Sequence, residues 1–158
     1  EESTRPFGLP MTPFELLELV GLKVGAHVLD THHAAFPERF FESKNLHKLA
    51  ELGFIFDRDS KGKSKGVSKK AVEIVAGGES PMTAEMLQIR IEDGLADEIH
   101  RMLEDNVVAA AEDIDLCLIL GAGYPFQMGG VTPYLDRAGA SERAFGGTFH
   151  TPQIRGVQ

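Results

Sequence analysis

The feature that most constrains the fold of this chain is a long stretch of helical periodicity between Thr83 and Val108. Its apolar residues recur at steps of three and four, as one face of an α-helix requires. These residues are Ile91, Leu95, Ile99, Met102, Leu103 and Val107. The opposite face is expected to carry Glu92, Asp93, Glu98, Arg101 and Glu104. The pattern predicts an amphipathic helix that packs on other helices, with Gly94 at a close helix contact.

Further helices are predicted on both sides of this one. Thr12 is a good N-cap and Pro13 suits the first helical position, so a helix is expected from there to Gly21. Helical spacing then continues through residues 22–41. Shorter helices are predicted at residues 45–52, 112–120 and 132–138, with Gly121 ending the second of them.

The remaining segments carry weaker signals. Residues 54–56 are expected to form an isolated strand or an extended plug into a core, and the basic stretch 57–70 a solvated loop. Residues 76–81 are the best linker, and the tail after Gly146 is expected to be loose or laid across a surface. The Gly62-Lys63-Ser64 run lacks the frame of a phosphate-binding loop, which leaves a transient contact with coenzyme A phosphates as the other interpretation.

Charge and composition exclude several classes of protein. A net charge of -8 over 158 residues disfavours nucleic acid or an anionic membrane as the main partner. No apolar run approaches the ~20 residues of a membrane helix. A single cysteine, Cys117, excludes an internal disulfide framework, fits a reducing compartment and is expected in the core. The beginning of the chain lacks a signal-peptide layout, so we expect a cytoplasmic protein. The first residue is not Met, which indicates a processed product or a piece of a longer polypeptide, and the repeat and the motifs below favour the piece.

A weak internal repeat has an offset of 118 residues. Residues 11–21 align with residues 129–139, so that Leu17 meets Leu135, Glu18 meets Asp136 and Gly21 meets Gly139. A long and a short predicted helix precede the second copy, but only a few residues precede the first. The repeat therefore predicts two related units, the first without its opening helices.

These residues also resemble a known family. Residues 8–22, GLPMTPFELLELVGL, resemble the signature of the 3-hydroxyacyl-CoA dehydrogenase C-terminal domain, in which Thr12 replaces a usual Gly and Glu18 a usual Asp. Residues 112–136, which include GAGYPF and YLD, are similar to the second, degenerate copy in the multifunctional fatty-acid oxidation α-subunit. The resemblance covers nearly the whole chain.

The resemblance implies an all-α fold built from two related helical units of the 6-phosphogluconate dehydrogenase C-terminal type. Residues 1–78 would form the truncated first unit with its Lys/Gly-rich loop, and residues 79–158 the second, degenerate unit. Such a chain would be the C-terminal helical portion of an NAD-dependent 3-hydroxyacyl-CoA dehydrogenase of β-oxidation. It would contribute to closure of the acyl-CoA site and to the dimer or pseudodimer interface, without catalysing the reaction alone.

The family's catalytic residues have no match in this sequence. The His–Glu pair and Ser belong to a Rossmann domain, and the matching Asn would lie upstream of residue 1 or at Ile89, where the amide is absent. No cofactor is expected in this portion, and NAD would belong to the parent enzyme. The apolar neighbourhood of the substrate carries over to Leu9, Pro10, Met11, Pro13 and Phe14. The implied partners are the Rossmann and hydratase domains, with a homodimer or a thiolase subunit as further candidates.

Other interpretations remain open. The chain could instead be a stand-alone acyl-CoA-binding or protein-interaction module, because residues 14–20 and 36–41 are rich in apolar side chains. No metal site is predicted, since His27, His32 and His33 have unsuitable spacing. His100 and His150 have no convincing carboxylate partner in the sequence. The glycines of residues 121–126 follow a helix rather than a strand, which favours packing over dinucleotide binding.

Overall fold

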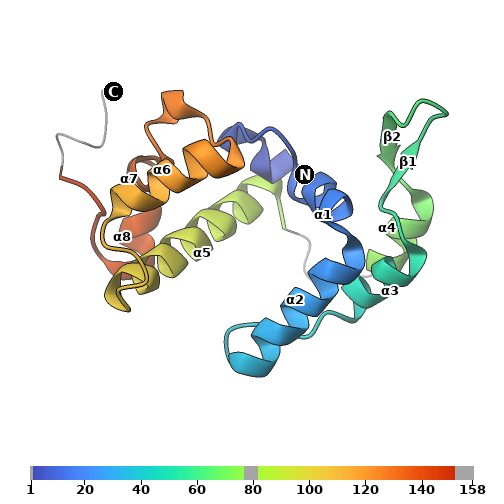
Figure 1. Ribbon diagram of the computed structural model, residues 1–158, viewed down its shortest axis with the longest axis horizontal. Helices are drawn as coiled ribbons and strands as arrows, with labels where there is room; N and C mark the ends of the chain where they lie inside the picture. The colour runs from blue at the N-terminus through green and yellow to red at the C-terminus, as the bar shows by residue number, and fades with distance from the viewer. Residues whose placement is uncertain (1, 77–81, 152–158) are drawn as a thin grey trace. The chain divides into compact units, whose positions relative to one another are not determined.

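The computed structural model describes residues 2–76 and 82–151, and it is mostly helical (Figure 1). The elements in chain order are η1 (Glu2–Phe7), α1 (Pro13–Val20), α2 (Leu22–Ala35), α3 (Lys44–Leu52), β1 (Phe56–Arg58), β2 (Ser64–Val67), α4 (Lys69–Val75), α5 (Ala84–Glu104), α6 (Ala111–Ala122), η2 (Phe126–Met128), α7 (Val131–Arg137) and α8 (Ala140–Phe145). The predicted helical class is therefore confirmed. A small antiparallel hairpin of β1 and β2 is the exception among the described residues.

The chain forms two compact units. The hairpin unit comprises Met11–Pro81, and the α5 unit comprises Glu1–Pro10 together with Met82–Gln158. The expected boundary followed residue 78, whereas here the first ten residues group with the later unit. The reason is local: η1 packs on α5, and Phe7 is only 3% exposed with its ring centroid 5.4 Å from that of Tyr134. Most of the expected linker, residues 77–81, lies outside the described residues.

The hairpin unit is built around the packing of α2 on α3. Its core consists of Leu22, Ala26, Leu49, Ala50, Ile55, Phe56 and Ala71. The α3 helix begins with a hydrogen bond from the Leu46 amide to the Ser43 hydroxyl and ends at Gly53, whose φ of 86° is left-handed. The expected plug is present, because Ile55 and Phe56 are buried directly after this turn.

The prediction of an irregular loop over residues 57–70 is wrong. Phe56 pairs with Val67 and begins the antiparallel hairpin, and α4 begins at Lys69. The Asp59 carboxylate closes the turn by accepting hydrogen bonds from the Lys61 and Lys63 amides, both at 2.9 Å. Most residues of the hairpin are exposed, so its sequence lacks the alternation of apolar and polar residues that predicts a half-buried strand. The helical spacing over 22–41 predicts a break or a new turn at Pro37, and α2 ends just before it, at Ala35.

The α5 unit surrounds a second core. Its buried members are Ala96, Ile99, Ile114, Tyr124, Val131, Leu135 and Ala140. The α5 helix begins at its expected N-cap, Thr83, whose hydroxyl accepts a hydrogen bond from the Met86 amide. The α6 helix continues through Gly121 to Ala122 and ends at left-handed Gly123, so Gly121 does not end it as predicted. Cys117 is exposed on this helix and not in the core.

The predicted orientation of α5 is confirmed at Ile99 but wrong at Glu92 and Leu95. Glu92 and Ala96 are buried together with Ile99, whereas Leu95 is 38% exposed. Glu92 belongs inside because its carboxylate accepts a hydrogen bond from the Tyr134 hydroxyl at 2.6 Å. Burial and this hydrogen bond raise the pKa of Tyr134 above its ordinary value. The helix thus buries a satisfied polar pair that periodicity alone assigns to the surface.

The short helices near the end of the chain are bounded by glycines. The α7 helix lies at the expected place, whereas α8 was not predicted. It begins after Gly139 and ends at Gly146, whose φ angles of 70° and 72° are left-handed. After Gly146 the tail turns inward, because His150 is 5% exposed and Phe149 packs against the core. The described part of the tail, residues 147–151, is therefore docked rather than loose.

Substitutions at two glycines, one in tight contact and one with open space around it, test the packing of the α5 unit. Gly130 has a φ of 118°, and an added Cβ would lie 2.6 Å from the Asp115 Oδ1 atom, whereas a Cβ on Gly94 would meet nothing within 4 Å. Gly130→Ala is expected to lower the free energy of unfolding by about 2–4 kcal/mol, from backbone strain and overpacking. Gly94→Ala is expected to raise it by about 0.5–1 kcal/mol, because alanine is the better helix former. Urea denaturation measures both, and equal effects would contradict the packing described.

Candidate functional site

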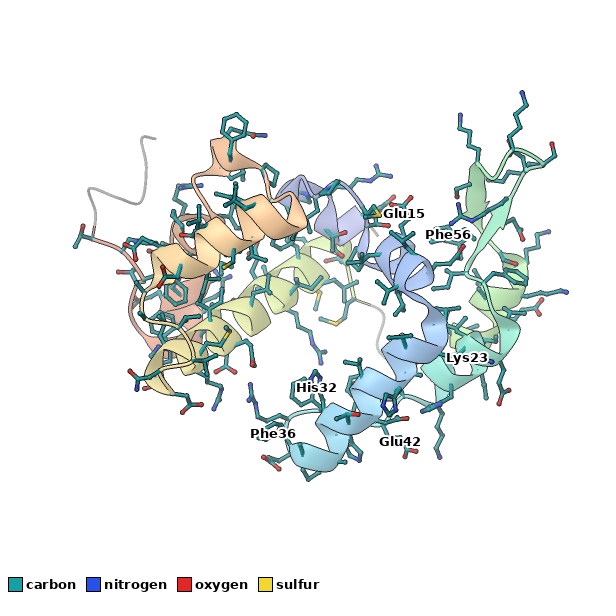
Figure 2. The ribbon with its side chains drawn as sticks, in the orientation of Figure 1. Glu15, Lys23, His32, Phe36, Glu42 and Phe56 are labelled. Carbon is teal, nitrogen blue, oxygen red and sulfur yellow. The ribbon has the colours of Figure 1, made fainter. Side chains whose placement is uncertain are left out.

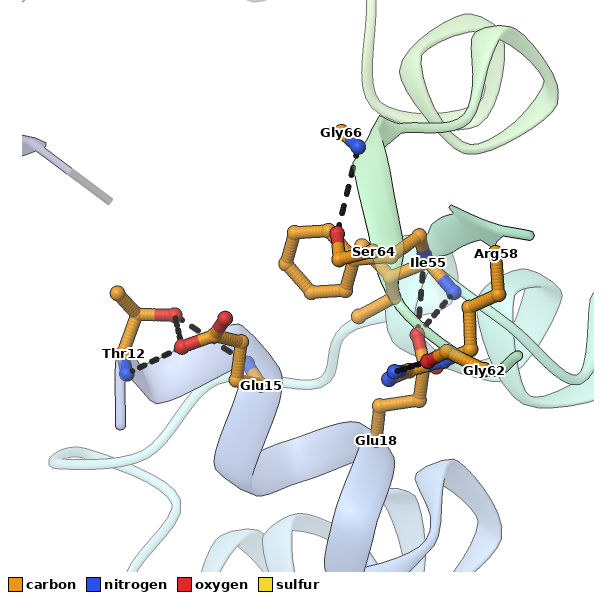
Figure 3. Close-up of polar contacts among 9 residues, drawn as sticks. Thr12, Glu15, Glu18, Ile55, Arg58, Gly62, Ser64 and Gly66 are labelled. Atoms are coloured by element: carbon orange, nitrogen blue, oxygen red, sulfur yellow. Dashed lines mark hydrogen bonds and ion pairs between the residues drawn. The ribbon is translucent and has the colours of Figure 1, made fainter. Parts of the chain in front are cut away.

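The beginning of α1 is fixed by a complete capping box (Figure 3). The Thr12 hydroxyl oxygen accepts from the Glu15 amide at 3.4 Å, and the Thr12 amide donates to the Glu15 carboxylate at 2.9 Å. The hydrogen bonds from the Thr12 backbone and side chain lower the pKa of Glu15. Predicting Thr12 as the N-cap was therefore correct. The capping box holds the backbone that carries Met11, Pro13 and Phe14.

The five predicted substrate residues are all exposed. Leu9 is 40%, Met11 38% and Phe14 45% exposed, and both prolines are exposed as well. Leu9 and Pro10 belong to the α5 unit and the other three to the hairpin unit. Pro10 lies close to Gly123, because a Cβ atom added to that glycine would lie 3.4 Å from the Pro10 Cγ atom. Such exposure leaves these apolar side chains available for contact.

Apolar exposure continues along the hairpin unit beyond these residues. The exposed apolar side chains of α1 and α2, with the residue after α2, are Phe14, Leu16, Leu19, Val20, Val24, Val28 and Phe36. We call this set the apolar face. Figure 2 places Phe36 and His32 at the opposite end of α2 from Lys23, so the set extends along the whole helix.

The Glu18 carboxylate ties α1 to the hairpin (Figure 3). Its Oε2 atom accepts from the Ile55 and Phe56 amides at 2.8 and 3.0 Å, and its Oε1 atom accepts from the Arg58 guanidinium at 2.8 and 3.0 Å. The Glu18 side chain is only 12% exposed. Burial raises its pKa, but the hydrogen bonds from Phe56, Ile55 and Arg58 outweigh burial and lower the pKa overall. Glu18 therefore holds a negative charge that positions the hairpin.

Asp136 makes a similar set of contacts in the α5 unit. Its Oδ2 atom accepts from the His150 amide at 2.9 Å, and its Oδ1 atom from the Phe149 amide at 3.0 Å and the Ser141 hydroxyl at 2.6 Å. Like Glu18, it lies on a short helix and binds two consecutive backbone amides of a later segment. Sequence analysis aligned Glu18 with Asp136 but did not identify what either carboxylate binds.

A third carboxylate, Asp115, caps α7 from outside that helix. Its two oxygens accept from the Thr132 amide at 2.8 Å and the Thr132 hydroxyl at 2.6 Å. The N-cap position is Gly130, which has no side chain, so Asp115 provides the missing cap. The Thr132 oxygen can then accept from His150 Nε2 at 2.7 Å.

His150 therefore does have carboxylate neighbours, contrary to the sequence-based expectation. Its Nδ1 atom lies 3.6 Å from Glu112 and its Nε2 atom 3.7 Å from Asp115. A pocket of about 250 Å³ adjoins them, lined by Glu112, Asp115, Leu116, Ile119, Gly129, Pro133 and His150. Thr132 is fully buried, so its hydroxyl cannot meet a substrate. The arrangement holds the tail and offers no accessible nucleophile.

The other histidines occupy separate environments. His27 lines a pocket of about 270 Å³ with His47 and Asp30, whose Nε2 and Oδ1 atoms are 3.0 Å apart. His33 Nδ1 is hydrogen-bonded to the Phe40 carbonyl, and the His100 ring stacks on Phe145 at 4.2 Å. Across residues 2–76 and 82–151, no group of three or more His, Cys, Asp or Glu side chains is placed to hold a metal ion. No helix in these two stretches is long and apolar enough to cross a membrane.

The fold and these contacts together define a class of protein. The described residues form a helical domain with buried carboxylates that position its turns and an exposed apolar face, not an α/β nucleotide-binding domain. Residues 2–65 match the family described as 3-hydroxyacyl-CoA dehydrogenase, C-terminal domain. This segment belongs to that family, as the motif in residues 8–22 indicates.

The curated relatives align with nearly the whole chain. The chain is 33% identical over 153 residues to the fatty acid oxidation complex subunit alpha of Acinetobacter baumannii (strain SDF), and this match covers 86% of the chain. It is 34% identical over 155 residues to the protein of the same name from Pseudomonas savastanoi pv. phaseolicola (strain 1448A / Race 6), also over 86% of the chain. The chain spans about a fifth of the length of these relatives, 21% in both cases.

Neutralising Glu18 tests its role through pH. Because its pKa is lowered in the folded state, its contribution to stability is present above the ordinary value of 4.5 and is lost as pH falls through the lowered value. Glu18→Gln is expected to lower the free energy of unfolding by about 1.5–3 kcal/mol at pH 7, because charged hydrogen bonds to two amides and Arg58 are weakened. The gap to the unmodified chain should narrow as pH falls below 4.5.

Chemical denaturation at a series of pH values measures this gap. Glu51→Gln is the matched control, because it removes the same charge from an exposed position on α3 of the same unit. A gap that stays constant with pH, or an equal loss in Glu51→Gln, would show that the Glu18 carboxylate does not hold the hairpin.

Proposed function

We propose that this chain is the C-terminal helical portion of an NAD-dependent 3-hydroxyacyl-CoA dehydrogenase of fatty-acid β-oxidation. The observation that carries the proposal is the match of residues 2–65 to the dehydrogenase C-terminal domain, joined to relatives named fatty acid oxidation complex subunit alpha along most of the chain. In this role the chain helps to close the acyl-CoA site and does not catalyse the reaction by itself. NAD binds to the Rossmann part of the parent enzyme.

The substrate neighbourhood in this proposal is the exposed stretch from Leu9 to Phe14. Leu9, Pro10, Met11, Pro13 and Phe14 contact the apolar part of the acyl-CoA. Two observations support this assignment: the side chains are exposed although apolar, and the capping box holds the backbone of α1 in place. Within the hairpin unit, the capping box fixes the backbone of Met11, Pro13 and Phe14, which lowers the conformational entropy that these residues lose on binding an acyl chain.

We also propose that the two units are copies of one ancestral unit, the first without its opening helices. Supporting features recur at the offset of 118 residues. The N-caps Thr12 and Gly130 correspond, and Gly21 and Gly139 both have positive φ angles and begin the next helix. Glu18 and Asp136 each bind two consecutive amides. The matching roles support the repeat more strongly than the thin sequence identity does.

The partners in this proposal are the other domains of the parent polypeptide, the Rossmann and hydratase domains. Relatives about five times as long as the aligned segment support further domains. The apolar face favours contact with one of these domains or with a second copy of the chain. A thiolase subunit is the remaining partner of the proposed complex, which would operate in the cytoplasm.

A chimera tests the proposed function. The aligned fifth of the Acinetobacter baumannii relative is replaced by this chain, and NADH oxidation with acetoacetyl-CoA is measured. The proposal expects activity in the chimera and no turnover by the chain alone. Turnover by the chain alone near that of the relative, or an inactive but folded chimera, would refute it.

A side-chain substitution in the chimera locates the substrate contact. Phe14→Ala is expected to raise the KM for acetoacetyl-CoA several-fold and to change the melting temperature little, because Phe14 is 45% exposed. Phe41→Ala is the control, since Phe41 is 71% exposed and lies outside the proposed substrate stretch. Equal KM values for the two variants would show that Phe14 does not contact the substrate.

The second candidate function is a stand-alone acyl-CoA-binding or interaction module, which the extent of the apolar face favours. Calorimetry of the chain alone with an acyl-CoA distinguishes the two functions. Micromolar affinity that is lost in Phe14→Ala would favour the binding module, whereas the first proposal expects affinity that is much weaker in the chain than in the chimera.

A further inference from the structure

The hairpin and the beginning of α4 carry the strongest positive charge in an acidic chain. Five exposed lysines lie here: Lys61, Lys63, Lys65, Lys69 and Lys70. None of the five has an ion-pair partner among residues 2–76 and 82–151. The whole chain has a net charge of -8, so the charge of this local cluster is opposite to the net charge of the chain. We call these five residues the basic cluster.

The neighbouring carboxylates Asp57, Asp59 and Glu73 offset only part of the positive charge, because residues 57–73 contain six Lys and Arg against three Asp and Glu. The Asp59 carboxylate accepts from the Lys61 and Lys63 amides, and so forms the turn. Arg58 is bound to Glu18 and also donates to the Gly62 carbonyl at 3.1 Å. These contacts fix the hairpin backbone before any ligand arrives, which lowers the entropy lost on binding.

A β-bulge in the hairpin falls at Lys65, the central lysine of the basic cluster. Asp57 pairs with Gly66 while Arg58 pairs with Ser64, so Lys65 is the extra residue. Gly66 allows the bulge, because it adopts a φ of 112° that favours glycine. Lys63 lies just before β2 and Lys65 is the extra residue of the bulge, so both exposed ammonium groups lie at the same end of the hairpin.

The composition of the hairpin narrows the chemistry of its ligand. Between Lys61 and Lys70 the sequence has no aromatic ring on which a nucleic-acid base could stack, and Val67 is its single apolar side chain, too little to anchor the hairpin in a lipid bilayer. Lysine ammonium groups bind phosphate as point charges, without the paired geometry that carboxylates favour with arginine. A small ligand with several phosphate groups therefore fits the basic cluster best.

We propose that the basic cluster binds the phosphate groups at the nucleotide end of coenzyme A. The identity of this ligand rests on the proposed function, in which the substrate is an acyl-CoA. The apolar face and the basic cluster belong to the same hairpin unit, so one unit offers surfaces for both the acyl and the phosphate parts of such a molecule.

The test is an NMR titration of the ¹⁵N-labelled chain with coenzyme A, dephospho-coenzyme A and pantetheine. Coenzyme A is expected to shift the Gly62 and Gly66 amide resonances, with at least several-fold weaker binding of dephospho-coenzyme A and no shift with pantetheine. Lys63→Gln/Lys65→Gln is expected to raise the Kd for coenzyme A at least fivefold. Raising the NaCl concentration from 50 to 300 mM should also weaken binding, because salt screens charge contacts.

Lys44→Gln/Lys48→Gln is the matched control, because it removes two exposed lysines from α3 and changes the net charge equally. Its Kd should stay within twofold of the unmodified chain. Equal weakening by both pairs would overturn the proposal by assigning the effect to net charge. No response to coenzyme A, whether or not the chain binds vesicles of phosphatidylglycerol, would also overturn it.

The chimera separates this inference from the proposed function. An active chimera whose KM for acetoacetyl-CoA is unchanged by Lys63→Gln/Lys65→Gln would refute only the phosphate contact. An inactive chimera together with selective binding of coenzyme A by the basic cluster would refute only the role in the dehydrogenase.

Discussion

Buried or partly buried carboxylates that accept hydrogen bonds from backbone amides are the interaction on which the rest of this structure depends. Glu18 binds the Ile55 and Phe56 amides, and Asp136 binds the Phe149 and His150 amides. In both places an extended segment enters a small core where helix or sheet partners do not reach its amides. A charged acceptor satisfies two such amides at once, which a neutral side chain does less strongly. The buried charge is in turn stabilised by these hydrogen bonds.

These contacts explain how a largely helical chain supports features that are not helical. The hairpin has little apolar surface of its own, and Glu18 with Arg58 and Asp59 holds it in place. Likewise, the tail after α8 is docked by Asp136, with His150 beside Thr132. Small cores leave little stability to spare, so a few strong polar contacts decide which irregular segments are ordered.

The hairpin unit combines two surfaces of different chemistry. Its apolar face lies on α1 and α2, while its basic cluster lies on the hairpin and the beginning of α4. An acyl-CoA has the same division, with an apolar chain at one end and phosphates at the other. The proposed role in a β-oxidation dehydrogenase and the proposed phosphate contact thus depend on different residues of one unit, and each can fail without the other.

The sequence by itself determined the helical class, the positions of most helices and the family of residues 2–65. Capping residues such as Thr12 and Thr83 and left-handed glycines such as Gly53 act on their nearest neighbours along the chain, so local sequence contains their signal. A motif also marks the exposed apolar stretch from Leu9 to Phe14, whose contact with substrate stays a proposal. Only the tertiary structure decided that Glu92 is buried, that Asp115 caps α7 and that Glu18 holds the hairpin. Those polar contacts join residues 17 to 42 positions apart, and no local periodicity or propensity encodes which distant group will satisfy a buried charge.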